Sequence, residues 1–159
     1  MIKSCLPFII DEETEILILG SQPSDLSLEK SEYYGNSGND FWDLVGNAIG
    51  EDLIGESYYK RIEILKKNGI GLWDVIKSSE RKGSMDCNIF EEEINDFSKL
   101  FDIYPKLKII FLNGKKAGKY SYLFEDKIKT VVLPSSSGAN RKNNKNRINE
   151  WKKISQSRF

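Results

Sequence analysis

Hydroxyl, amide and carboxylate side chains gather after each of four short apolar segments of this sequence, and they are its candidates for chemistry. The segment at residues 15–19 is followed by GSQPS at residues 20–24 and by YYGNSGNDFW at residues 33–42. The later segments are followed by Asp74, by Asn113 and by PSSSGANR at residues 134–141. Side chains of these types bind polar ligands, orient water and stabilise developing charge. Taken singly, each group is also typical of an ordinary turn or helix cap.

The residues that the sequence lacks exclude several kinds of site. It has no histidine and two cysteines, Cys5 and Cys87. A zinc site built from His and Cys, a four-cysteine iron–sulfur site and a Ser-His-Asp or Cys-His nucleophile all need more of these residues. We therefore expect no metal and no cofactor, and chemistry carried by carboxylates, amides, hydroxyls, lysines or backbone dipoles. Both cysteines are expected to be small buried hydrophobes.

The four apolar segments predict strands that are buried on both faces, at residues 15–19, 70–73, 107–112 and 130–133. Helical patterns lie between these segments. They begin at Asp40 and at Ser57, and further ones cover residues 88–101, 115–124 and 144–157. Asp40 is expected to cap its helix, and Asn88 with Glu91 resembles a capping box.

The alternation of strands and helices predicts an α/β fold. We expect three α/β/α layers around a central four-stranded parallel sheet, in a single domain of residues 1–159. The carboxyl ends of parallel strands share one edge of the sheet, where folds of this class bind their ligands. The four groups of polar residues should therefore meet at that edge.

Charge is distributed unevenly along the chain although the net charge is zero. Residues 141–159 contain seven Lys or Arg and one Glu, and residues 99–119 contain six Lys and one Asp. This asymmetry indicates an anionic partner on one face, and a solvated helix face is the alternative. No apolar run has the length of a membrane span, and the N-terminus has no small-residue cleavage site. We expect a cytoplasmic protein without a membrane partner.

Three stretches of the chain carry a resemblance to a known family. ILILGSQPSDLSLEKSEYYGNSGNDFW resembles the first motif region of the mismatch-specific uracil/thymine glycosylases, a branch of the uracil-DNA glycosylase superfamily, and LPSSSGANR resembles their second. GLWDVIKSSERKGSMD, taken together with LPSSSGANR, resembles more narrowly the hypoxanthine-DNA (deoxyinosine) glycosylases. The resemblance covers roughly residues 15–155.

The resemblance implies an enzyme of DNA base excision repair. Such an enzyme flips a deaminated base, preferably hypoxanthine, out of DNA and hydrolyses its N-glycosidic bond without a cofactor. No lysine lies in an apolar strand-end context, so we expect a monofunctional hydrolase rather than a Schiff-base lyase, and we expect a monomer. A glycosylase for uracil, xanthine or mismatched thymine is one alternative. A nucleic-acid-binding homologue that has lost catalysis is another, and Gln22 and the missing histidine keep it open.

Two amide residues are the candidates for catalysis. The resemblance places Asn39 first, because an amide both orients water and donates to a base, and a helix cap is the alternative role. Gln22 stands where the mismatch-specific relatives have a catalytic Asn, so it is the second candidate. The family's histidine is absent from the second motif, which leaves backbone N–H groups to stabilise more of the charge on the departing base.

Other residues of the matching regions are expected to bind the base and the DNA. Tyr34 is the expected stacking platform, with its neighbour Tyr33 in the core. Asp74 stands where uracil enzymes have a base-reading Asn, and it would accept the N1–H of hypoxanthine; a helix cap or a pair with Arg81 is the alternative. Ser21 and Gly20 complete the base site. The expected DNA-binding residues are Pro134, Ser135, Ser136, Ser137, Gly138, Ala139, Asn140 and Arg141.

Overall fold

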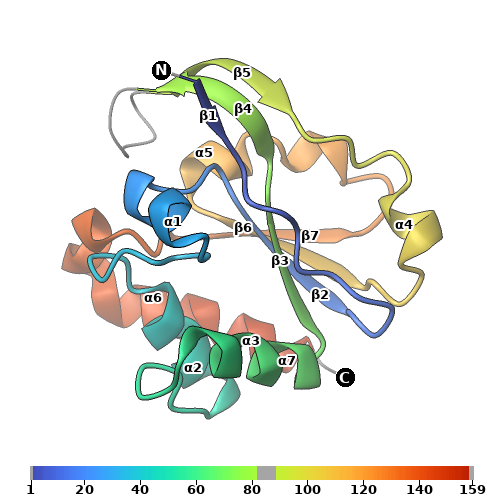
Figure 1. Cartoon of the computed structure of the whole chain (residues 1–159). Coiled ribbons are helices and arrows are strands. Elements are labelled where there is room, and N and C mark those ends of the chain that lie inside the picture. The colour runs from blue at the N-terminus through green and yellow to red at the C-terminus, as the bar shows by residue number, and fades with distance from the viewer. Residues whose placement is uncertain (1, 82–88, 158–159) are drawn as a thin grey trace.

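A four-stranded parallel sheet forms the centre of the computed structural model, which describes residues 2–81 and 89–157. Its strands are β2 (Ile16–Gly20), β3 (Ile70–Asp74), β6 (Ile109–Asn113) and β7 (Lys129–Leu133), in the spatial order β3-β2-β6-β7 (Figure 1). All three neighbouring pairs are parallel. The predicted fold class and the four predicted strands are therefore confirmed.

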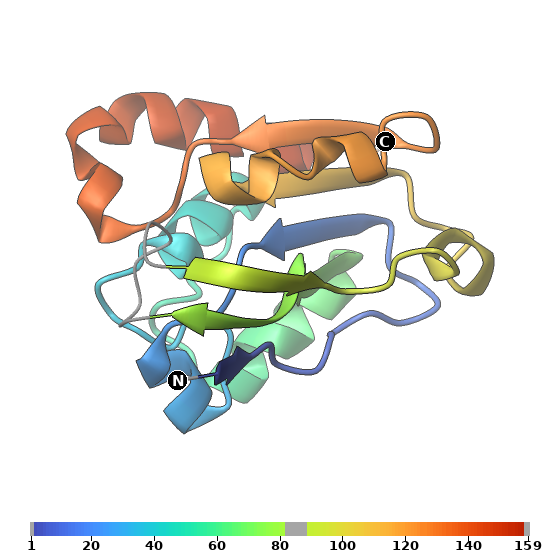
Figure 2. The same ribbon diagram turned by 90° about the horizontal axis from the view of Figure 1, so that it is seen from above.

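One face of this sheet is covered by the longer helices. They are α2 (Phe41–Ile49), α3 (Tyr58–Lys67), α6 (Asn144–Trp151) and α7 (Lys153–Gln156), and Figures 1 and 2 show them together on the same side. Ile16 and Ile18 point into this layer, where they pack in one cluster with buried residues of all four helices. Side chains alternate across a strand, so the intervening Leu17 and Leu19 must pack on the opposite face.

The opposite face has a thinner helical layer than the sequence predicts. It contains α4 (Leu100–Ile103), α5 (Lys115–Gly118) and the 3-10 turn η2 (Ser121–Leu123), so the single helix expected at residues 115–124 is two short pieces. Phe97, Leu100 and Phe124 fill the space between these turns and the sheet. The α/β/α arrangement holds, but aromatic side chains supply much of this layer.

A second, antiparallel sheet was not predicted, and it replaces an expected helix. It has the order β1-β4-β5, from β1 (Ile2–Ser4), β4 (Ile76–Arg81) and β5 (Ile89–Ile94). The helix predicted at residues 88–101 is wrong over β5, and Asn88 lies outside the described residues. The β4–β5 pairing shifts register twice and Glu91 has a φ of 53°, so the period-two pattern of a regular strand is hidden in the sequence.

The small sheet continues directly from the large one. Val75 alone separates β3 from β4, and Figure 1 shows the two strands as one long ribbon. The short helix α1 (Asp25–Lys30), which was also not predicted, begins at Ser24, whose hydroxyl accepts a hydrogen bond from the N–H of Ser27. Cys5 is half-buried rather than fully buried, and Cys87 lies outside the described part of the chain.

Arg147 of α6 is completely buried and joins three segments of the chain. Its Nη1 donates to the carbonyl oxygens of Ser135 and Ser137, at 3.1 and 3.2 Å. Its Nη2 donates to Asp40 Oδ2 and to Asn144 Oδ1, both at 2.7 Å. The sequence groups Arg147 with the basic C-terminal residues that would face DNA, but its burial gives it a structural role instead.

Asp40 is held by a second arginine and does not cap α2. Arg141, in the 3-10 helix η3 (Gly138–Asn143), donates from Nε and Nη2 to the two carboxylate oxygens at 2.8 and 2.7 Å. The predicted cap is wrong, since Asp40 makes no side-chain bond to the helix and Asn39 Oδ1 accepts the N–H of Phe41 at 3.0 Å. Hydrogen bonds from Arg141 and then Arg147 hold the pKa of the Asp40 carboxyl below its ordinary value of 3.8.

The substitution Asp40→Asn should lower the free energy of unfolding by roughly 3 kcal/mol at neutral pH, because Arg147 would lose its buried counter-charge. A carboxyl whose pKa is lowered by folding contributes stability above its ordinary pKa and loses it as pH falls through the folded value. The difference between wild type and Asp40→Asn should therefore shrink below about pH 4. Urea unfolding at a series of pH values measures it. The exposed Asp126→Asn is the control, and a difference that stays constant with pH would contradict the assignment.

Candidate active site

Gly20 lies where the base-binding candidates converge at the carboxyl edge of the sheet. The register of β2 and β3 places it opposite Asp74. A methyl group on Gly20 would lie 2.7 Å from Asp74 Oδ1 and 3.0 Å from the Tyr34 hydroxyl oxygen. The backbone here is fixed, because the carbonyls of Gly20 and Ser21 accept hydrogen bonds from the N–H groups of the two residues after Asp74. The glycine therefore provides the space into which both side chains project.

Tyr34 reaches this space with its hydroxyl. One face of its ring is stacked on Phe41, with ring centroids 3.8 Å apart and planes inclined by 10°. Tyr34 has a φ of 53°, a left-handed conformation that is uncommon for an aromatic residue and is often found at functional positions. Tyr33 is 3% exposed and its hydroxyl donates to the carbonyl of Pro7 at 2.9 Å. Tyr33 thus lies in the core as expected, and the role of Tyr34 as a stacking residue stays a prediction.

Asp74 places a carboxylate in a buried position beside the space left by Gly20. The residue is 3% exposed, and its carbonyl oxygen accepts from Asn95 Nδ2 at 2.7 Å. Burial, and then the negative charge of Asp74, raises the pKa of the Tyr33 hydroxyl. Arg81 belongs to β4, where it is in register with Ile89 of β5.

Asn39, Ser136 and Asn113 form a hydrogen-bonded chain at the same edge. Asn113 Nδ2 donates to the Ser136 hydroxyl at 2.9 Å, and that hydroxyl donates to Asn39 Oδ1 at 2.7 Å. Asn113 Nδ2 also lies 3.2 Å from the Tyr34 hydroxyl, which connects the chain to the stacking residue. Sequence reasoning noted Asn113 but gave it no role; a polar residue that ends an otherwise apolar strand was the available signal.

Ser136 differs from the other residues expected to bind DNA. It is 1% exposed, and its hydroxyl is used by the two asparagines. Its backbone joins the two motif regions as well, since its carbonyl accepts the N–H of Asp40 at 2.8 Å. The buried Ser136 hydroxyl is therefore not accessible to a phosphate. Its hydrogen bonds connect Asn39 with Asn113.

The rest of the loop at residues 134–141 uses its polar groups to hold its own shape. The hydroxyls of Ser135 and Ser137 accept backbone N–H groups within the loop, and Asn140 Nδ2 donates to the carbonyl of Ser135 at 3.1 Å. The carbonyl of Pro134 accepts from the buried Trp151 indole at 2.9 Å. These bonds leave the loop ordered before any partner binds.

The tip of this loop is exposed and touches the first motif region. A side chain on Gly138 would collide with the carbonyl oxygen of Gly38, so the two backbones are in direct contact. Ala139 lies exposed beside this contact. Arg141 is exposed, but its guanidinium forms an ion pair with Asp40. Binding of Arg141 to a DNA phosphate would compete with that ion pair.

Gln22 is the candidate catalytic residue that the geometry favours least. It is 9% exposed, its Nε2 donates to the carbonyl of Lys3 at 2.8 Å, and its Oε1 accepts from the hydroxyl of Ser79. Both ends of the amide are thus used to connect β1 with β4. Positioning a water with this side chain would require breaking a buried link between strands.

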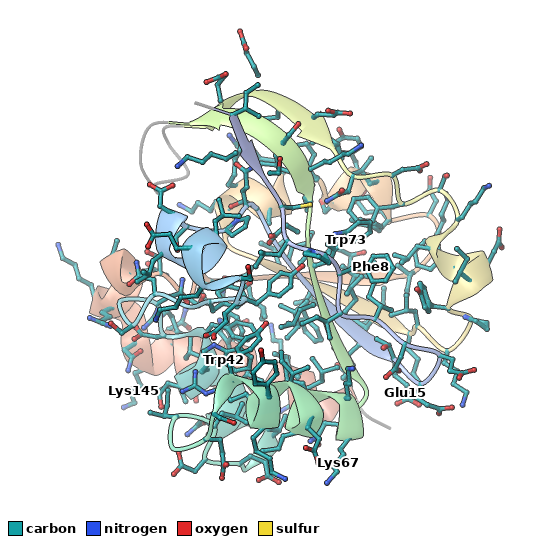
Figure 3. All side chains as sticks on the ribbon, viewed as in Figure 1. Phe8, Glu15, Trp42, Lys67, Trp73 and Lys145 are labelled. Carbon is teal, nitrogen blue, oxygen red and sulfur yellow. The ribbon has the colours of Figure 1, made fainter. Side chains whose placement is uncertain are left out.

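The exposed positive charge near the site lies on η3 and α6. Lys142 and Lys145 border a shallow hollow there together with Asn146 and Asn149. Lys145 points outward from α6 at the left of Figure 3, whereas Lys67 of α3 lies at the bottom of the same view. Among residues 2–81 and 89–157, no helix is long and apolar enough to cross a bilayer, and no group of three or more Cys, Asp or Glu is placed to hold a metal ion.

Comparisons with known proteins agree with this arrangement. The model of the uracil DNA glycosylase superfamily matches residues 7–157. A curated protein named hypoxanthine DNA glycosylase from Methanosarcina acetivorans is 57% identical over 155 residues, covering 97% of this chain and 98% of the relative. One of the same name from Methanosarcina barkeri is 52% identical over 152 residues, covering 95% and 96%.

A solved structure has the same fold. It is a solution NMR structure of a Methanosarcina acetivorans protein described as a candidate uracil DNA glycosylase, with a TM-score of 0.91, 55% identity and full coverage of both chains. The family model spans both motif regions, the strand that carries Asp74 and the helices behind them. The chain therefore belongs to the uracil DNA glycosylase superfamily, as its motifs predicted.

Proposed function

We propose that this protein is a monofunctional DNA glycosylase that hydrolyses the N-glycosidic bond of hypoxanthine in DNA. The buried carboxylate of Asp74, beside the space left by Gly20 and the ring of Tyr34, is the observation that carries the proposal. Two relatives that match nearly the full chain at 52% and 57% identity bear the name hypoxanthine DNA glycosylase, which supports it.

Asp74 would read the edge of the flipped base. Hypoxanthine has a hydrogen on N1, which a carboxylate accepts, whereas adenine has none there and would leave the carboxylate facing a lone pair. Guanine has the same N1–H, so Asp74 would not distinguish it from hypoxanthine. Another feature must keep guanine from being excised. A well-paired guanine costs more to extrude than the weaker pairs of inosine.

Tyr34 would hold the flipped base from one side. Stacking on an aromatic ring contributes about 1–3 kcal/mol per base, and Phe41 already fixes the ring from behind. Ala139, at the exposed tip of the second motif, would lie against the DNA stack, where its methyl group cannot fill a vacated base position. The enzyme would therefore rely on pairs that open easily, such as inosine opposite thymine.

Asn39→Ala should lower single-turnover excision of hypoxanthine by at least about tenfold, the order expected when a positioned polar group is removed. Gln22→Ala should remain within about threefold of wild type, because that amide is used between strands. Duplexes with one hypoxanthine, uracil, xanthine or G·T mismatch, cleaved by alkali after incubation, measure both variants. No excision from any duplex by wild type would overturn the proposed function, and a large loss in Gln22→Ala alone would move catalysis to that residue.

Asp74→Asn should reduce hypoxanthine excision about tenfold or more, because a charged acceptor for N1–H becomes a weaker neutral one. Uracil excision should fall less, which the same assay measures as a ratio of rates. Asp96→Asn changes an exposed aspartate away from the strand ends and is the matched control. An unchanged hypoxanthine-to-uracil ratio would show that Asp74 does not read the base.

The double variant Lys142→Ala, Lys145→Ala should weaken DNA binding and reduce the slope of log affinity against log salt by about 1–2, since each lost phosphate contact removes about 0.9 from the slope. Lys66→Ala, Lys67→Ala removes the same charge from α3 and should leave the slope unchanged. Fluorescence anisotropy with a labelled duplex gives both slopes. Equal effects of the two pairs would mean that the hollow on α6 does not face the DNA.

A further inference from the structure

The amide of Asn39 is held in one orientation. Its Oδ1 accepts the backbone N–H of Phe41 at 3.0 Å and the hydroxyl of Ser136 at 2.7 Å. A backbone N–H can only donate, so the atom facing Phe41 must be the oxygen. A carbonyl oxygen has two lone pairs, and both are directed into the protein.

A second backbone group fixes the same orientation independently. The N–H of Ser136 donates to Asn113 Oδ1 at 3.0 Å, which makes the other amide atom of Asn113 the nitrogen. That Nδ2 donates to the Ser136 hydroxyl oxygen, so the hydroxyl proton turns toward Asn39. Asn113 is 8% exposed and Ser136 1% exposed, so water does not compete strongly for these bonds.

The hydrogen-bonding capacity that Asn39 has left is therefore that of a donor. Within the part of the chain that the structure describes, Nδ2 of Asn39 donates to no protein acceptor, while Oδ1 is fully engaged. The sequence-based prediction gave this amide two tasks, orienting water and donating to the base. Orienting water for attack requires an acceptor for the water proton, and Asn39 has already used its acceptor.

We infer that Asn39 acts as a hydrogen-bond donor to the departing base, and that Ser136 and Asn113 are positioning residues that set this polarity. The inference rests on the proposed glycosylase function. In the reaction the bond between C1′ of the sugar and N9 of hypoxanthine breaks, and its electron pair leaves with the base. A water oxygen adds to C1′ and releases a proton to solvent, and the base takes up a proton from solvent. An N–H donor stabilises the charge that appears on the base as that bond breaks.

The substitution Asn39→Asp distinguishes a donor from an acceptor. A carboxylate keeps the bonds from Phe41 and Ser136 but turns a second oxygen toward the departing base, so hypoxanthine excision by Asn39→Asp should be slower than by Asn39→Ala by about threefold or more. Rates of both variants are compared from about pH 6 to about pH 9. Both variants keep Asp40 next to residue 39, the Arg141 and Arg147 that bind it, and the Asp74 and Tyr34 beside Gly20, so the ratio compares residue 39 among the same neighbouring groups. An Asp variant that is faster than the Ala variant and gains with pH would show that residue 39 takes a proton from water, which would overturn the inference.

Ser136→Ala tests the positioning chain through a double-mutant cycle. Alone it should lower the single-turnover rate about tenfold with little change in DNA affinity, because Asn39 Oδ1 then loses one of its two donors and the amide is held less firmly. In the Asn39→Ala background it should have almost no further effect, since no amide remains to be oriented. Ser79→Ala removes another buried hydroxyl, on β4, and any effect it has should be the same in both backgrounds.

The outcomes distinguish a failure of the proposed glycosylase function from a failure of the positioning role. Absence of excision by wild type rejects the glycosylase function. Excision by wild type together with additive effects of Ser136→Ala and Asn39→Ala rejects the positioning role and retains the function. Thermal unfolding of each variant identifies any rate loss that follows from misfolding.

Discussion

The buried guanidinium of Arg147 is the interaction on which the site depends. A charge with no access to solvent is costly unless it is paired and hydrogen-bonded. Here Asp40 and three backbone or amide oxygens accept from the two Nη groups, while Nε has no partner among the described residues. Those partners belong to the loop before α2, the loop after β7 and the start of α6. Because Asp40 adjoins Asn39, and Ser135 and Ser137 flank Ser136, the same arginine fixes both halves of the catalytic hydrogen-bonded chain. Arg147, which the sequence groups with the residues expected to face DNA, thus has a structural role beside the candidate active site.

The chemistry fits a chain without histidine. Under the proposed function, a carboxylate would read the base, an aromatic ring would hold it and amide N–H groups would stabilise its leaving charge, and none of these roles requires a group that titrates near neutral pH. Phe41 connects two of these features, because its ring supports Tyr34 and its N–H fixes Asn39. Gln22, the second amide that the sequence indicated for catalysis, instead links β1 and β4.

The large sheet was predictable because its strands are short, continuous apolar runs, a pattern that buried parallel strands share. The small sheet was not, since bulges and a left-handed Glu91 remove the alternation by which β4 and β5 would be recognised, and their apolar spacing imitates a helix. Within the site, the sequence indicated Tyr34, Asp74 and Asn39 as candidates, and the structure brings them to one edge. It did not separate Asn39 from Asp40 as the helix cap, nor Ser136 from its neighbours, because these distinctions depend on contacts between residues about a hundred positions apart.

The contact between Gly38 and Gly138 joins the surface that meets DNA to the catalytic amide. The two backbones touch with no side chain between them, so no soft layer absorbs a displacement of either loop. Under the proposed function, residue 139 would lie against the duplex, residue 138 touches residue 38, and residue 39 carries the amide. A displacement of the loop tip by bound DNA would therefore be transmitted through this contact to the loop that holds Asn39.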